Sequence, residues 1–156
     1  MSVGFEVKEP GKIYSQVGVV LDNSVAMRWL VASGKKVDQR YALSVRDFIQ
    51  EERPRVMVPY LWTYEAANVV AYYVRQGELE YSVAINTLLA LHDLCSIAID
   101  RGETPIALFE AAEAHGVTAY DAAYLLLARS EGLPLATLDR KMRKVAKGMG
   151  IDVFGL

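Results

Sequence analysis

The sequence predicts one α/β domain in which a parallel sheet is covered by helices on both faces. Short, continuous apolar runs such as residues 17–21 are typical of strands buried on both sides. Segments with helix caps alternate with these runs, which is the pattern of a parallel α/β sheet. The 156 residues, 53% of them hydrophobic, suffice for one domain with a substantial core. We place this domain at residues 17–156 and interpret residues 1–16 as an N-terminal extension.

The first predicted strand, residues 17–21, ends at Asp22-Asn23-Ser24, three residue types that favour the N-cap of a helix extending to Gly34. Asp38 is expected to cap a second helix. Further strands are expected at residues 55–58, 96–99, 135–138 and 151–154.

Glycine, threonine and proline mark the ends of the later helices. Gly77 closes one helix, and Thr104-Pro105 is a cap followed by a first-turn proline. Thr118 begins the next. Further helices are expected at about residues 60–76, 79–93, 104–116, 118–132 and 140–147.

Composition limits the classes of function. The chain has 17 Lys+Arg and 19 Asp+Glu, a net charge of −2, so nucleic-acid binding requires a local basic patch. Cys95 is the single cysteine, which excludes an intrachain disulfide and a cysteine-based zinc site and fits a reducing cytoplasm. No signal peptide and no apolar run of about 20 residues is evident, so we expect a soluble cytoplasmic protein without a membrane contact.

Two aspartates follow predicted strands directly. Asp22 follows residues 17–21, and Asp139 follows residues 135–138. Ligands of parallel α/β sheets gather beyond the carboxyl ends of the strands, so both carboxylates are candidates for one site. The alternative is that each side chain only caps the helix after it.

Two further acids occupy unusual helical positions. Glu65 is centred on an apolar stripe, where a carboxylate is costly unless it is paired, protonated or bound to a cation. A solvated Glu65 is the alternative. Asp121 stands three residues after Thr118, so the two can form a capping box, and an apolar turn follows. Capping uses one carboxylate oxygen and is compatible with metal binding.

These four acids have no histidine at ligand spacing. His92 and His115 are interpreted as surface or helix-end residues. A site made only of carboxylate oxygens favours a hard cation, Mg²⁺ or Mn²⁺, over Zn²⁺.

The fragments around the acids occur in a characteristic order. They are Val-Val-Leu-Asp22-Asn-Ser, Tyr-Glu65-Ala-Ala-Asn-Val-Val, Thr-Ala-Tyr-Asp121-Ala-Ala-Tyr-Leu and Leu-Ala-Thr137-Leu-Asp139-Arg-Lys. Together they resemble the PIN-domain ribonucleases and, more narrowly, the VapC-type toxins of bacterial and archaeal toxin–antitoxin pairs. The resemblance covers the chain from about Val17 to its C-terminus. Asn23 departs from it, because the family more often has a small residue there.

The resemblance implies an endoribonuclease that hydrolyses RNA phosphodiesters with metal-activated water. Asp22 and Asp121 are the first choices as metal ligands, followed by Asp139, and then by Glu65 as a ligand or water-orienting base. One or two metal ions are compatible with this set. Ser24 and Thr137 are candidates to orient these ligands, or simply to cap and pack.

Cations and aromatics complete the prediction. Five cations follow Asp139 and can attract phosphate, or form only a solvated helix face: Arg140, Lys141, Arg143, Lys144 and Lys147. Six aromatics fall within 22 residues, and we expect most in the core and some in a groove for a partner: Tyr60, Trp62, Tyr64, Tyr72, Tyr73 and Tyr81. The resemblance implies a small antitoxin and a homodimer as partners of this helical region.

Three alternatives belong to other classes. A catalytically silent PIN-like module, binding protein or RNA, is the main one. A phosphoacceptor receiver domain needs paired acids after its first strand, and Asp22-Asn23 lacks the pair. Phosphatases of the Asp-x-Asp type fail at Ser24, which replaces the second acid.

Overall fold

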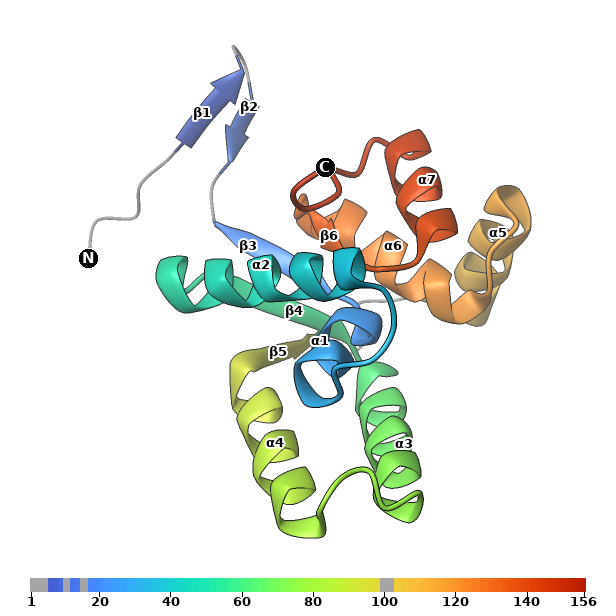
Figure 1. Cartoon of the computed structure of the whole chain (residues 1–156). Coiled ribbons are helices and arrows are strands. Elements are labelled where there is room, and N and C mark those ends of the chain that lie inside the picture. Colours follow the sequence, from blue (N-terminus) through green and yellow to red (C-terminus); the bar gives the residue numbers. More distant parts are fainter. Residues whose placement is uncertain (1–5, 10–11, 15–16, 99–102) are drawn as a thin grey trace.

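A four-stranded parallel sheet forms the centre of the protein. The computed structural model describes residues 6–9, 12–14, 17–98 and 103–156. The sheet has the strand order β5-β4-β3-β6. Its strands are β3 (Gly18–Leu21), β4 (Arg55–Pro59), β5 (Cys95–Ala98) and β6 (Leu135–Ala136). A separate antiparallel hairpin joins β1 (Glu6–Glu9) and β2 (Lys12–Tyr14) within the predicted extension, and Figure 1 shows it apart from the sheet.

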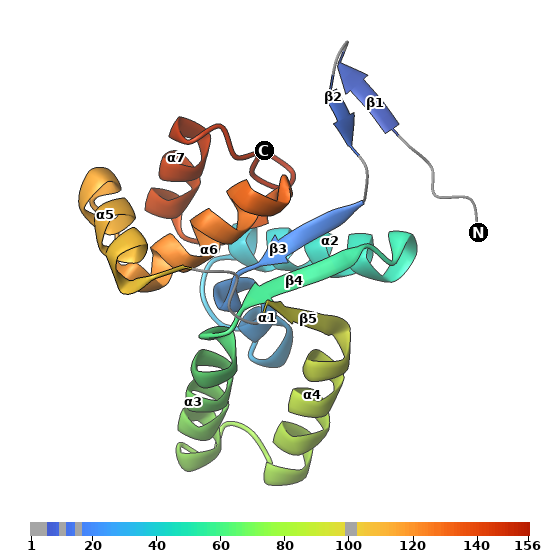
Figure 2. The same cartoon turned by 180° about the vertical axis from the view of Figure 1, so that it is seen from behind.

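Seven helices within the described residues surround the sheet. They are α1 (Asn23–Leu30), α2 (Lys36–Glu52), α3 (Trp62–Arg75), α4 (Tyr81–Leu94), α5 (Pro105–His115), α6 (Ala119–Glu131) and α7 (Arg140–Gly148). Figures 1 and 2 show that α3 and α4 form a pair extending away from the sheet. None of these helices is long and apolar enough to cross a membrane.

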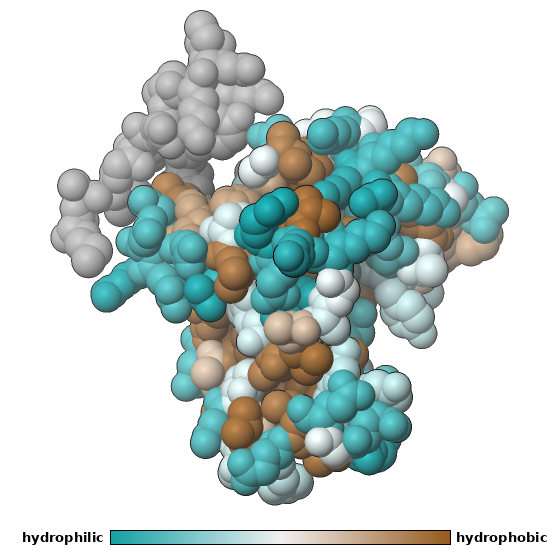
Figure 3. Space-filling model, viewed as in Figure 1, coloured by the Kyte–Doolittle hydropathy of each residue, from teal (hydrophilic) through white to brown (hydrophobic). Residues whose placement is uncertain are grey.

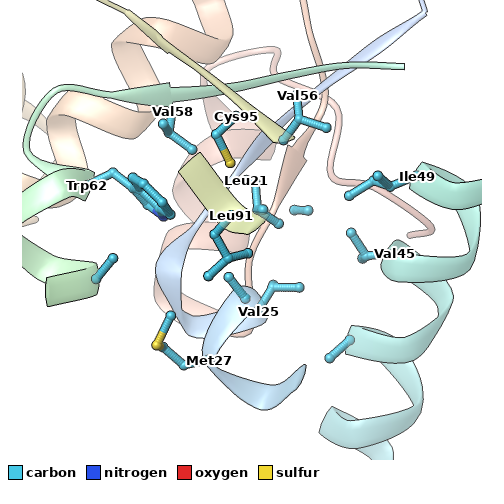
Figure 4. Close-up of a cluster of buried hydrophobic side chains, with 14 of the residues drawn as sticks. Leu21, Val25, Met27, Val45, Ile49, Val56, Val58, Trp62, Leu91 and Cys95 are labelled. Carbon is cyan, nitrogen blue, oxygen red and sulfur yellow. The ribbon is translucent and has the colours of Figure 1, made fainter. Parts of the chain in front are cut away.

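The two faces of the sheet bury separate cores, as the continuous apolar strands predict. Val19 and Leu21 of β3 pack with residues of α1 to α4 on one face, where Figure 4 shows Val45 and Trp62 around them. Val20 points to the other face and packs with α6 and α7. The predicted α/β class, with helices on both faces, is therefore confirmed.

The strand order determines where a ligand can bind. In chain order, β3, β4 and β5 extend the sheet in one direction, and β6 then returns to the opposite side of β3. The order therefore reverses between β3 and β6. Crevices at such a reversal, beyond the carboxyl ends of the strands, are the usual ligand sites of open α/β sheets.

Several predicted elements differ in the structure. The first helix ends at Leu30 and does not extend to Gly34, and the strand expected at residues 135–138 is limited to Leu135–Ala136. Residues 151–154 were expected to form a strand, but Leu135 and Val153 make only an isolated bridge. β6 has only two residues, and the backbone of Leu135 makes the bonds to Asp152 and Phe154. The second helix begins at Lys36, so Asp38 lies in its first turn and is not its cap; a carboxylate there is favoured by the helix dipole.

Candidate active site

Asp22 lies at the end of β3 and is 8% exposed. Its Oδ2 accepts hydrogen bonds from Ser24 Oγ at 2.6 Å and from Thr137 Oγ1 at 2.7 Å. The side chain makes no capping bond to α1, so capping does not explain this acid. Burial raises the pKa of Asp22, the two hydroxyls and the Asn23 backbone oppose that rise, and the charge of Asp121 adds to it.

Thr137 ties the ends of β3 and β6 together. Its fully buried hydroxyl donates to Asp22 and accepts from the backbone N–H of Asp139 at 3.1 Å. Ser24 makes a parallel link, because its Oγ accepts from the backbone N–H of Leu138 at 3.1 Å. These bonds cross the point where the strand order reverses, so both hydroxyls predicted beside the acids contact Asp22 and hold it in place.

Glu65 is half-buried in the first turn of α3. Its Oε1 accepts a hydrogen bond from Tyr124 Oη at 2.8 Å. Burial raises the pKa of Glu65, the Tyr124 bond opposes the rise, and the charges of Asp22 and Asp121 increase it. Glu65 is therefore a partly buried carboxylate bonded to Tyr124, and the charges of Asp22 and Asp121 act on it.

Asp121 and Asp139 both act as helix caps. Asp121 forms the predicted capping box with Thr118: Oδ2 accepts from the Thr118 N–H at 3.3 Å, while Thr118 Oγ1 accepts from the Asp121 N–H at 3.1 Å. Asp139 is exposed, and its Oδ1 accepts from the N–H of Met142 at 2.9 Å. The backbone N–H of Asp139 also donates to Thr137 Oγ1, the hydroxyl that in turn donates to Asp22.

The acids have the donor chemistry of a divalent cation site. Their side chains supply only oxygen, and burial together with mutual repulsion raises the pKa of Asp22 and Glu65, an arrangement that a hard cation relieves. The Oδ1 of buried Asn23, beside Asp22, has no hydrogen-bond partner among the described atoms. Across residues 6–9, 12–14, 17–98 and 103–156, however, no three His, Cys, Asp or Glu side chains lie within ligating reach of one point. The oxygen donors fit a hard cation in chemistry, although their spacing in the described residues does not by itself form a ligand set of three.

Tyr124 is a site residue that the sequence analysis missed. It lies in the apolar run of α6, which we interpreted only as a buried helix face. One signal was present: Tyr124 follows Asp121 by three residues, so both side chains lie on neighbouring parts of one helix surface. The partner of its hydroxyl, Glu65, is 59 residues away in the sequence.

The cations of α7 divide into two groups. Four are exposed to solvent: Arg140, Lys141, Lys144 and Lys147. Arg143 instead donates from Nε to the Thr137 carbonyl oxygen at 2.7 Å, and its guanidinium lies 4.4 Å from the centre of the Tyr41 ring. These contacts tie α7 and α2 to the residues after β6, so Arg143 differs from its neighbours in having a structural role.

Most of the clustered tyrosines are on the surface, so the expectation that they lie mostly in the core was wrong. More than half of the side chain is exposed in each of Tyr60, Tyr64, Tyr72 and Tyr81, whereas Trp62 is buried. The reason is that α3 and α4 extend from the sheet and have few elements to pack against. In Figure 3, hydrophobic residues lie among hydrophilic ones in the part of the molecule that contains this pair. His92 and His115 are exposed near helix ends, as predicted.

Comparison with known proteins finds one family over most of the chain. Residues 19–148 match the model of the PIN domain family. The chain is 32% identical over 114 residues to "Exonuclease VapC9" of Pyrobaculum aerophilum, covering 72% of this chain and 84% of that protein. It is 36% identical over 91 residues to "Ribonuclease VapC3" of the same organism, covering 53% and 64%. A crystal structure of PAE2754 from Pyrobaculum aerophilum superposes with a TM-score of 0.64 at 25% identity, covering 85% of this chain and 87% of that one.

Proposed function

This chain belongs to the PIN-domain family, and on that premise we propose that it is a metal-dependent endoribonuclease acting as the toxin of a toxin–antitoxin pair. The observation that carries the proposal is the buried Asp22, held by two hydroxyls where the strand order reverses, with Glu65 and Asp121 within electrostatic reach. The relatives named exonuclease and ribonuclease support the nuclease assignment.

We assign the metal to Asp22 and Asp121 first, then to Asp139, with Glu65 as a further ligand or as the base that orients water. At these residues a bound Mg²⁺ or Mn²⁺ would supply an acidified water and would neutralise charge on the phosphate. Ser24 and Thr137 hold the carboxylate of Asp22 in one orientation through their bonds to Oδ2. Glu65, held by Tyr124 through Oε1, is suited to accept a proton from the attacking water.

The test is cleavage of RNA by the purified protein. We expect cleavage with Mg²⁺ or Mn²⁺, loss of cleavage with EDTA, and recovery when the metal is returned in excess. A catalytically silent binding module is the alternative, favoured by the capping bonds of Asp121 and Asp139. RNA that binds but stays intact with either metal would support that module and contradict the nuclease.

The exposed cations of α7 supply the local basic patch that an acidic protein needs to bind RNA. Arg140, Lys141, Lys144 and Lys147 are exposed on α7, the helix whose N-cap is Asp139. We propose that they attract the RNA backbone, which the salt dependence of RNA binding would report. Arg143 contributes mainly by holding the residues after β6 in place.

A small antitoxin is the proposed protein partner. The α3–α4 surface, defined here by the exposed apolar residues Tyr64, Tyr72, Tyr81 and Leu89, suits an apolar helix of such a partner. An arginine beyond that helix can then reach the carboxylates and form two parallel hydrogen bonds.

Co-expression with a neighbouring small open reading frame tests this partner. We expect a stable complex that does not cleave RNA, and expect cleavage to return when the inserted arginine is replaced. Leu89→Asp on α4 should weaken the complex, whereas Ile106→Asp on α5, which is also exposed and apolar, is the matched control. Dimers of this chain alone, with undiminished cleavage beside the co-expressed protein, would favour a homodimer and contradict the antitoxin.

A further inference from the structure

We propose that Tyr124 is a positioning residue that holds the Glu65 carboxylate in the active site. Its Oη donates to Glu65 Oε1 at 2.8 Å, so the bond joins α6 to α3 across the acidic site. The inference rests on the proposed function, because it takes Glu65 to act on metal or water there.

The four acids differ in how they are held. Asp22 is bound by two hydroxyls, and Asp121 and Asp139 are each anchored by a backbone N–H of their own helix. Glu65 has the longest side chain of the four, with three torsions to restrain, and lies on a different helix. Among the described residues, Tyr124 is the donor that restrains it.

The hydroxyl of Tyr124 is better explained by this contact than by packing. The side chain is 2% exposed, and its ring lies in the core with residues of α6, α7 and the sheet. Phenylalanine would fill the same volume without burying a polar group, which is costly unless bonded. A tyrosine hydroxyl has an ordinary pKa of about 10, so it carries its proton at neutral pH and acts as the donor to Glu65.

The Tyr124→Phe substitution removes the hydroxyl and keeps the ring, so it tests the hydroxyl alone. We expect a folded protein whose kcat for RNA cleavage falls about 10-fold with little change in KM, and whose affinity for Mn²⁺, measured by electron paramagnetic resonance without RNA, falls by a similar factor. Tyr41→Phe is the matched control, since it removes a hydroxyl bonded to the Phe154 carbonyl oxygen at 3.0 Å. That variant should keep the Mn²⁺ affinity of the wild type.

A second comparison tests whether the hydroxyl acts through Glu65. Adding Tyr124→Phe to Glu65→Ala should lower Mn²⁺ affinity no further than Glu65→Ala alone, because the acceptor is already gone. Additive losses would overturn the inference, as would a Tyr124→Phe protein with wild-type kcat and Mn²⁺ affinity. In both cases the nuclease assignment would stand. A wild-type protein that neither binds Mn²⁺ nor cleaves RNA would overturn the proposed function and this inference together.

Discussion

Asp22→Asn is expected to lower RNA cleavage by at least ~10²-fold while leaving the protein folded. The substitution changes little volume, and an amide oxygen can still accept bonds from Ser24 and Thr137. What disappears is the negative charge at the point where the strand order reverses, where a cation and the attacking water must be held. Steady-state cleavage of a labelled RNA, with circular dichroism as the folding check, measures both parts of the expectation.

Asp152→Asn is the matched control for that change. Asp152 is an exposed aspartate near the C-terminus, and the same loss of charge there should leave cleavage within about twofold of the wild type, as for most surface substitutions. Undiminished cleavage by a folded Asp22→Asn protein would contradict the assignment of the site.

Metal ions are expected to stabilise the protein, and the effect should grow with pH. Burial raises the pKa of Asp22 above 3.8 and that of Glu65 above 4.5, so in the metal-free protein the native state binds these protons more tightly than the unfolded chain does. Their contribution to stability is complete below those ordinary values and is lost as pH rises through the raised pKa values. A cation binds the deprotonated carboxylates and replaces the missing protons. Its stabilising effect is therefore expected to be largest at pH values above the raised pKa values.

Thermal unfolding at several pH values, with EDTA or with Mn²⁺, measures this linkage. At 100 times its Kd a ligand adds about 2.7 kcal/mol to the free energy of unfolding, which raises the Tm of a domain of this size by roughly 5–10 °C. We expect that rise near pH 7.5 and little of it near pH 4.5. In Asp22→Asn the metal-free protein should lose less stability as pH rises, and Mn²⁺ should add less. An equal Mn²⁺ effect in both proteins at every pH would mean that the ion binds elsewhere.

Local interactions are what the sequence by itself determined. The capping box of Thr118 and Asp121 and the cap at Thr104 depend on bonds between residues three apart, so their spacing alone predicts them. The run at residues 17–21 predicts a strand because burial on both faces requires apolar side chains at every position. The four acids were found in the same way, from charges placed where a strand ends or an apolar helix face begins.

The tertiary structure alone determined which side chains contact these acids. Strand order is not encoded in any local pattern, and it is this order that places β6 beside β3 and lets Thr137 bond Asp22. The bond from the Tyr124 hydroxyl to Glu65 was likewise not predictable, because Tyr124 lies in an apolar run and the two residues are distant in the sequence.

The solvent exposure of side chains also depended on the tertiary structure. Aromatic side chains such as the tyrosines of α3 and α4 are commonly found in protein cores. Here they lie at the surface because these helices extend beyond the sheet. Arg143 has the sequence context of its solvated neighbours, yet Tyr41 and the Thr137 carbonyl bind it. Composition and spacing report what a side chain prefers, whereas contacts between distant segments determine which preference is met.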